Sequence, residues 1–84
     1  MKLVLIEWLD AYGGDDGWEH LNGSEPEELV CRSVGWLVCD GHKTKTVVPH
    51  LTARDHPHAE YQGCGHMIIP TAAVRRIIDL EERS

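Results

Sequence analysis

The chain has 84 residues, enough for a single domain spanning residues 1–84 and too few for a second core. Its apolar content of 42% is typical of a folded protein, and 14 acidic against 8 basic side chains give a formal net charge of −6. That charge disfavours non-specific attraction to nucleic acid or to an anionic membrane, so we expect neither as a partner. A chain this short has a thin stability margin, which assembly into a homo-oligomer commonly increases.

The first residues carry no recognisable targeting signal. Lys2 is followed by a short apolar run that Glu7 interrupts, far shorter than a signal-peptide core or a membrane span. We therefore expect a cytoplasmic protein. Because the 3 cysteines are an odd number, free thiols are the expected state in a reducing compartment.

The N-terminal third is predicted to hold one strand followed by loops. Residues Lys2–Trp8 alternate in the manner of a strand, and the two faces carry Val4, Ile6 and Trp8 on one side and Leu3, Leu5 and Glu7 on the other. The acidic, glycine-rich residues 10–18 form a loop by composition. Residues 22–28 are a second turn cluster, in which Ser24 can cap a single helical turn.

The centre of the chain predicts a β-hairpin. An apolar run from about Leu29 to Cys39 reaches the pair Asp40-Gly41, and a second run extends from about Lys45 to Thr52. Asp and Gly tolerate the positive φ angles of a tight turn, so this pair predicts the bend. Trp36, in the middle of the first strand, is expected in the core.

The second run contains Pro49, which cannot donate a hydrogen bond to a neighbouring strand. We therefore expect this strand to lie at a sheet edge or to bulge at Pro49. Residues 54–65 are rich in Pro, His and Gly and predict an excursion from the sheet. His66–Ile69 is predicted to be a short strand that Pro70 ends.

The last segment leaves two alternatives open. In one, Thr71 caps a helix that places Val74, Ile77 and Ile78 on one face. In the other, residues 71–73 form a tight turn and Val74–Leu80 is a closing strand, which the β-branched residues favour. One of the two basic residues Arg75 and Arg76 is expected to point outward. The other is expected to pair with Asp79 or Glu81.

Together these elements predict a mainly β protein, a small SH3/Sm-like barrel of about five strands with long loops and little helix.

Four side chains have the chemistry of zinc ligands. Cys39 and His42 flank the predicted turn, and Cys64 and His66 form a second pair. Two thiolates and two imidazoles would complete a tetrahedral shell and stabilise a small domain. Neither spacing matches a paired zinc ribbon, so we prefer buried small thiols and surface histidines, and predict no metal and no cofactor.

The preferred binding site is an aromatic slot with cations nearby. The rings of Trp8, Tyr12 and Trp18 can frame a slot that stacks a base, unless they simply plug the loop. Arginines at strand ends can pair with a phosphate or carboxylate, although solvated charge is their usual state. The predicted ligand-binding residues are Trp8, Tyr12, Trp18, Arg32, His50, Arg54, His56 and His58.

The densest acidic cluster consists of Asp10, Asp15 and Asp16. It lacks the alternating ligands and the following bidentate acid of a calcium loop. A solvated acidic face explains it, and a basic surface on a protein partner is the alternative.

Several blocks of the chain resemble small accessory proteins encoded by bacteriophages. The blocks are Ile6-Glu7-Trp8-Leu9-Asp10-Ala11, Gly17-Trp18, Ser33-Val34-Gly35-Trp36-Leu37-Val38, Val47-Val48-Pro49 and Met67-Ile68-Ile69-Pro70-Thr71-Ala72-Ala73-Val74. The resemblance spans most of the chain in short apolar blocks. It implies an SH3- or Sm-like barrel and a host bacterial cytoplasm, and it carries no catalytic residue across. By analogy it also implies a role in countering host defences.

Three functions follow from these observations. The predicted one is a non-enzymatic homo-oligomer that sequesters a small nucleotide-type signal between aromatic residues and cations. The first alternative is an acidic inhibitor that binds a host defence protein. The second is a nucleotide hydrolase that uses zinc or the histidines His56 and His58.

Overall fold

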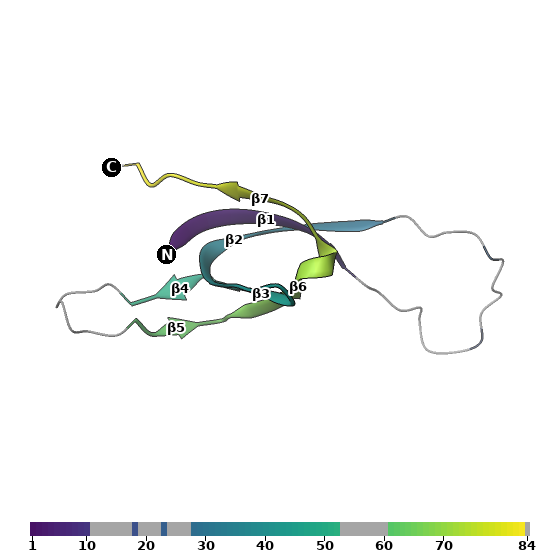
Figure 1. The fold of residues 1–84 in the computed structure, drawn as a ribbon, viewed down its shortest axis with the longest axis horizontal. Helices are drawn as coiled ribbons and strands as arrows, with labels where there is room; N and C mark the ends of the chain where they lie inside the picture. The colour runs from purple at the N-terminus through teal and green to yellow at the C-terminus, as the bar shows by residue number, and fades with distance from the viewer. Residues whose placement is uncertain (11–17, 19–22, 24–27, 53–60, 84) are drawn as a thin grey trace.

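The computed structural model describes residues 1–10, 18, 23, 28–52 and 61–83. The protein is mainly β with little helix, as the sequence predicts, and Figure 1 shows the arrangement. In chain order the elements are β1 (Lys2–Asp10), β2 (Leu29–Asp40), β3 (Thr44–Val48), β4 (His50–Leu51), β5 (Gly63–Cys64), β6 (Met67–Pro70), the 3₁₀ turn η1 (Thr71–Ala73) and β7 (Val74–Asp79). Within the described residues, no helix has the length and apolar character that crossing a membrane requires.

Five strands form one antiparallel sheet in the order β6-β3-β2-β1-β7. Figure 1 shows β2 curling strongly, so that β3 and β6 lie on the far side of the curl from β1 and β7. The short turn η1 joins the two outer strands β6 and β7. The closing strand preferred for residues 74–80 is therefore confirmed as β7, and the helix alternative is wrong.

The middle of β2 approaches β3 more closely than a side chain at that position would allow. A Cβ atom built at Gly35 would lie 2.6 Å from Val47 Cγ1 and 2.6 Å from the carbonyl oxygen of Val48. Real Cβ atoms essentially never come this close, so glycine is required where the sheet folds onto itself.

The core lies inside this curl. Its fully buried members are Val4 and Ile6 of β1, Val47 of β3 and Ile69 of β6. Partly buried apolar residues of β1, β2, η1 and β7 pack around them, namely Trp8, Leu37, Ala73, Val74 and Ile77. Alternation along β1 thus directs Val4, Ile6 and Trp8 inward, because successive side chains point to opposite sides of a strand.

Trp36 does not lie in this core, contrary to expectation. It is half-buried and pairs in register with Leu3, whose side chain lies on the face of β1 opposite to Val4. Residues directly opposite each other on neighbouring strands share a face, so Trp36 lies on the outside of the curled sheet.

The bend after Asp40 lies where the sequence predicts it but has a different geometry. Among the described residues only Gly23 and Gly65 have a positive φ, so the left-handed conformation expected for Asp40-Gly41 is wrong. The Gly41 N–H donates to the Thr44 carbonyl oxygen at 3.0 Å, and β3 begins at Thr44.

Side chains hold this bend in place. Lys45 Nζ donates both to the Asp40 carboxylate and, at 2.9 Å, to the Gly41 carbonyl oxygen. Thr71 Oγ1 donates to the same carbonyl at 3.0 Å, and the Thr71 N–H donates to the Lys43 carbonyl at 2.9 Å. The bend is therefore attached to η1, and this attachment holds the start of β3 beside the end of β6.

The predicted second strand is interrupted at Pro49, which separates β3 from β4. The short strand β4 pairs with β5, with His50 opposite Cys64 and Leu51 opposite Gly63. The described residues 61–65 lie outside the five-stranded sheet, in agreement with the predicted excursion, but Gly63 and Cys64 form a short strand, β5, that the sequence did not predict.

Candidate functional site

A hollow of about 490 Å³ lies between the outer side of β2 and β3 and the β4–β5 ladder. We call it the hairpin hollow, and it is lined by Met1, Val38, Thr46, Val48, Leu51, Tyr61, Gly63 and His66. Its volume falls in the range usual for pockets that hold small molecules.

Val48 forms the floor of the hairpin hollow. It is only 4% exposed although it does not belong to the core cluster inside the curl. Gly63 allows β5 to approach it, because a Cβ at Gly63 would lie 3.3 Å from Val48 Cγ1. A glycine in β5 therefore lets the small ladder pack directly on β3 and enclose one side of the hollow.

The β2–β3 register supplies the opposite wall. The pairing shifts between Leu37 and Cys39, so Val38 is the extra residue of a β-bulge. Val38 is exposed, and Thr46, opposite Cys39, contributes a hydroxyl to the same wall. The bulge therefore directs an apolar side chain toward the hollow at the point where the ladder covers it.

The chemistry of the hairpin hollow is an apolar floor with a polar and aromatic rim. Tyr61 and His66 add two aromatic rings, and both side chains are exposed. Among the described residues that line it there is no Lys or Arg. Such a lining suits a planar, uncharged ring that stacks on aromatic groups and hydrogen-bonds at its edges.

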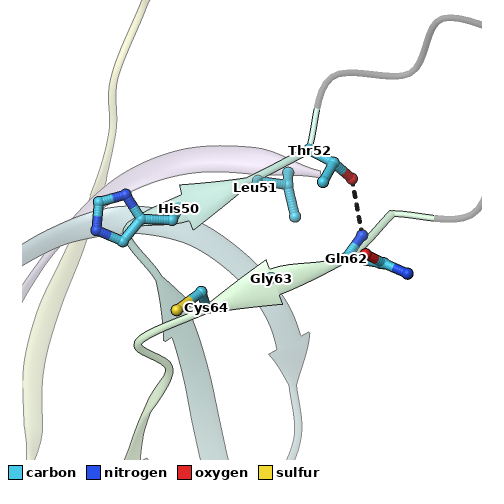
Figure 2. Close-up of a pocket in the computed structure, with 6 residues that line it drawn as sticks. All are labelled: His50, Leu51, Thr52, Gln62, Gly63 and Cys64. Carbon is cyan, nitrogen blue, oxygen red and sulfur yellow. Dashed lines mark hydrogen bonds between the residues drawn. The ribbon is translucent and has the colours of Figure 1, made fainter.

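The β4–β5 ladder also bears a smaller pocket on its own surface, of about 320 Å³ (Figure 2). Figure 2 shows His50 and Cys64 at one end of the ladder and Thr52 and Gln62 at the other. The Thr52 N–H donates to the Gln62 carbonyl at 2.8 Å, and the Gln62 N–H donates to Thr52 Oγ1 at 2.9 Å. These bonds extend the two-residue ladder and position Leu51 and Gly63, which line both pockets.

None of the four predicted site residues that the structure describes lines the hairpin hollow. Trp8 packs against the core and donates from Nε1 to Ser33 Oγ at 3.0 Å. Arg32 lies on the opposite face of the β1–β2 pair, where its Nε is 3.3 Å from Glu7 Oε1. Trp18 and His50 are exposed. The remaining four candidates, Tyr12, Arg54, His56 and His58, lie outside the described residues. Of the acidic cluster, Asp10 is exposed, and Asp15 and Asp16 lie outside the described residues.

Sequence reasoning missed Tyr61 as a site residue and considered His66 only as a metal ligand. Tyr61 falls inside residues 54–65, the stretch interpreted as an excursion, and no local pattern shows that this stretch returns to β3. The available signal was Gly63, since a glycine beside an aromatic residue in a strand can mark a close backbone approach.

The four predicted zinc ligands form two separate pairs. Cys39 and His42 lie on either side of the bend that precedes β3, whereas Cys64 and His66 lie near the other end of β3. Within the described part of the chain, no group of three or more His, Cys, Asp or Glu residues is placed to hold a metal ion. All 3 cysteines have free thiols, as expected, but the prediction that they are buried is wrong, since Cys39 and Cys64 are exposed and Cys31 is half-buried.

A cationic cluster lies on the outside of β1, β2 and β7, away from the hairpin hollow. The Glu7 carboxylate accepts from Arg76 Nε at 2.7 Å and from Arg76 Nη2 at 3.0 Å, with Arg32 beside it. The hydrogen bonds from Arg76, followed by the charges of Arg76, Arg32 and Arg75, lower the pKa of Glu7. The sequence predicts that one of Arg75 and Arg76 pairs with Asp79 or Glu81. Arg76 pairs instead with Glu7, and Asp79 pairs with Lys2 at 3.4 Å.

Comparison with known proteins assigns no family: no protein-family model, no curated protein and no solved structure matches this chain.

Proposed function

We propose that this chain is a non-enzymatic binding protein that holds a small molecule with a planar ring of the nucleobase type in the hairpin hollow. The observation that carries the proposal is the combination of a buried apolar floor, Val48, with two exposed aromatic rings, Tyr61 and His66. Stacking of a base on an aromatic side chain contributes roughly 1–3 kcal/mol and tolerates many ring types.

Specificity in this site comes from the edge of the ring. The Thr46 hydroxyl both donates and accepts, and the His66 imidazole offers one donor and one acceptor when it is neutral. Because no Lys or Arg is found among the described lining residues, the ring rather than a phosphate provides the recognition. The sequence analysis expects a nucleotide-type ligand, and we propose that the hairpin hollow recognises the base of that ligand.

A protein that sequesters a signal needs only to bind it and does not need to catalyse a reaction. The resemblance to phage accessory proteins supports a counter-defence role of this kind, and the hairpin hollow supports the binding step. A nucleotide signal held by its base would be withdrawn from its receptor and returned unchanged when the protein is denatured.

Isothermal titration tests the proposal with a panel of nucleosides, cyclic dinucleotides and ADP-ribose derivatives. We expect binding by at least one base-containing compound, and a loss of affinity of about 10- to 100-fold in Tyr61→Ala, the range that one stacking contact represents. Thr46→Val preserves the shape of the hollow and removes only the hydroxyl, so it is expected to change the preference among bases.

Two matched controls separate this site from the aromatic slot. Tyr12→Ala and Trp18→Ala remove two rings of the aromatic slot that the sequence favours. If these variants abolish binding and Tyr61→Ala does not, the hollow is not the site. No heat of binding across the panel, from protein that circular dichroism shows to be folded, contradicts the function itself.

A further inference from the structure

A second hollow lies beside the hairpin hollow on the outside of the curled sheet. It has a volume of about 410 Å³, and we call it the tryptophan hollow because Trp36 forms part of its wall. The residues that line it are Met1, Lys2, Leu3, Trp36, Asp79, Leu80 and Glu82. Trp36 is half-buried, so part of its ring is open to this hollow. A tryptophan that the sequence places in the core is therefore available to a ligand.

Strand pairing places the two hollows next to each other. Trp36 is directly opposite Leu3 on one side and directly opposite Val48 on the other. The three side chains form one row across β1, β2 and β3, since residues that oppose each other in register share a face. Val48 is the floor of the hairpin hollow, and Leu3 lines the tryptophan hollow. Because neighbouring strands are about 4.8 Å apart, a short linker can join groups that occupy the two hollows.

Met1 belongs to the walls of both hollows. It precedes β1, and its side chain is 60% exposed. Methionine is unbranched and adapts its shape to a neighbouring group, and its sulfur contacts aromatic rings favourably. A ligand that spans the two hollows therefore meets, at its middle, a side chain that can adjust to it.

The charges in the tryptophan hollow balance. Lys2 Nζ pairs with Asp79 Oδ2 at 3.4 Å, and the ammonium group of Met1 offsets the carboxylate of Glu82. A lining without net charge attracts a phosphate only weakly, whereas an indole ring stacks on any nucleobase, because every base has a π-face. The tryptophan hollow therefore suits the same kind of ring as the hairpin hollow.

We propose that the two hollows form one site, and that its ligand carries two planar rings of the nucleobase type joined by a short linker, as in a dinucleotide. This inference rests on the proposed function and extends it from one base to two. One ring lies over Val48 beside Tyr61 and His66, and the other stacks on Trp36. Each ring adds its own stacking contact, so a ligand with two linked bases binds more tightly than a single base.

Isothermal titration of the wild type compares each common nucleoside with its own dinucleoside monophosphate, ApA, GpG, CpC or UpU. We expect at least one dinucleoside to bind about 10- to 100-fold more tightly than its nucleoside, because it adds a second stacking contact. Trp36→Leu removes the ring and should lower the affinity for the dinucleoside to that for the nucleoside, while the affinity for the nucleoside stays unchanged. Trp36→Phe keeps an aromatic ring and should retain most of the difference.

Val34→Ala is the matched control, since Val34 is 54% exposed on the same strand and lines neither hollow. It should leave both affinities unchanged, and far-UV circular dichroism checks that each variant is folded. Dinucleosides that bind the wild type no more tightly than nucleosides overturn this inference, and so does an advantage that survives Trp36→Leu. Both outcomes leave the proposed function intact, whereas a titration in which no compound binds contradicts that function as well.

Discussion

The Arg76 guanidinium binds the Glu7 carboxylate through two nearly parallel hydrogen bonds, from Nε at 2.7 Å and from Nη2 at 3.0 Å. The two residues are directly opposite in the β1–β7 register, so the pair attaches the last strand to the first. Side-on pairs of this kind combine charge with fixed geometry and are the stronger form of ion pair. The Glu7 side chain is 16% exposed, whereas that of Arg76 is 59% exposed.

The Glu7–Arg76 pair predicts how stability depends on pH. Because the pKa of Glu7 is lowered in the folded state, chiefly by Arg76, its contribution is complete above the pKa of an unperturbed Glu. The contribution is lost as the pH falls through the lowered value. Glu7→Gln is therefore expected to be less stable than the wild type at neutral pH, with the difference shrinking in acid.

Urea unfolding at a series of pH values, followed by tryptophan fluorescence, measures this difference. Glu81→Gln, an exposed carboxylate beyond the end of β7, is the control and should leave the profile close to that of the wild type. Parallel profiles for Glu7→Gln and the wild type would show that the pair contributes no pH-dependent stability.

Gly35→Ala is expected to destabilise the fold. The added methyl would lie 2.6 Å from both Val47 Cγ1 and the backbone of Val48, and the backbone oxygen cannot move without disturbing β3. Overpacking of this kind costs about 1–3 kcal/mol, which in a domain this small lowers the melting temperature by several degrees. Val34→Ala, at the neighbouring exposed position, is the control. Equal melting temperatures for Gly35→Ala and the wild type would contradict the close approach.

Ile6→Ala is expected to destabilise the protein much more than Ile68→Ala, because Ile6 lies in the core and Ile68 on the surface. Ile6 has 0% exposure and touches the centre of the curl, whereas Ile68 is 58% exposed. Truncating a buried isoleucine costs about 2–5 kcal/mol, and a surface substitution usually changes stability by less than about 0.5 kcal/mol. Thermal unfolding at one protein concentration measures both. Similar losses in the two variants would place the core elsewhere.

Thr71→Val tests the link between η1 and the bend after β2. It removes the hydroxyl that donates to the Gly41 carbonyl at 3.0 Å, while Lys45 still donates to that oxygen. We expect a loss of about 1 kcal/mol, the usual net value of one such bond. Thr71→Ser retains the hydroxyl and should recover most of the loss. If Ser and Val are equally destabilising, the hydroxyl is not what holds the bend.

Strands whose evidence is local were predictable from the sequence. Val4, Ile6 and Trp8 alternate with their neighbours, so the strand and its two faces could be identified, but not which face points inward. A disturbance at Pro49 could be predicted from its missing N–H donor, but β3 is not the edge strand that was expected, and the strand is interrupted at Pro49 instead. In contrast, β5 was missed, because two residues such as Gly63-Cys64 form a strand only when another strand lies beside them.

The candidate site could be predicted less well than the fold. Trp8 was assigned to a binding slot, but its indole packs on the core, and only the pairing of β1 with β2 shows that Arg32 lies on the other face. Tyr61 was not predicted as a site residue, because nothing near it in the sequence indicates a pocket. Its place in the hairpin hollow depends on β5 returning over Val48.

The sequence by itself determined that this protein is built of strands and where its central chain reverses, but it left the last segment open between a helix and a strand. These properties depend on side-chain alternation and on residues such as proline, which act over a few positions. Only the tertiary structure decided which strands are neighbours, which tryptophan is inside and which residues surround a hollow. The physical reason is that antiparallel pairing brings together positions as distant as Glu7 and Arg76, and this depends on the close approach at Gly35.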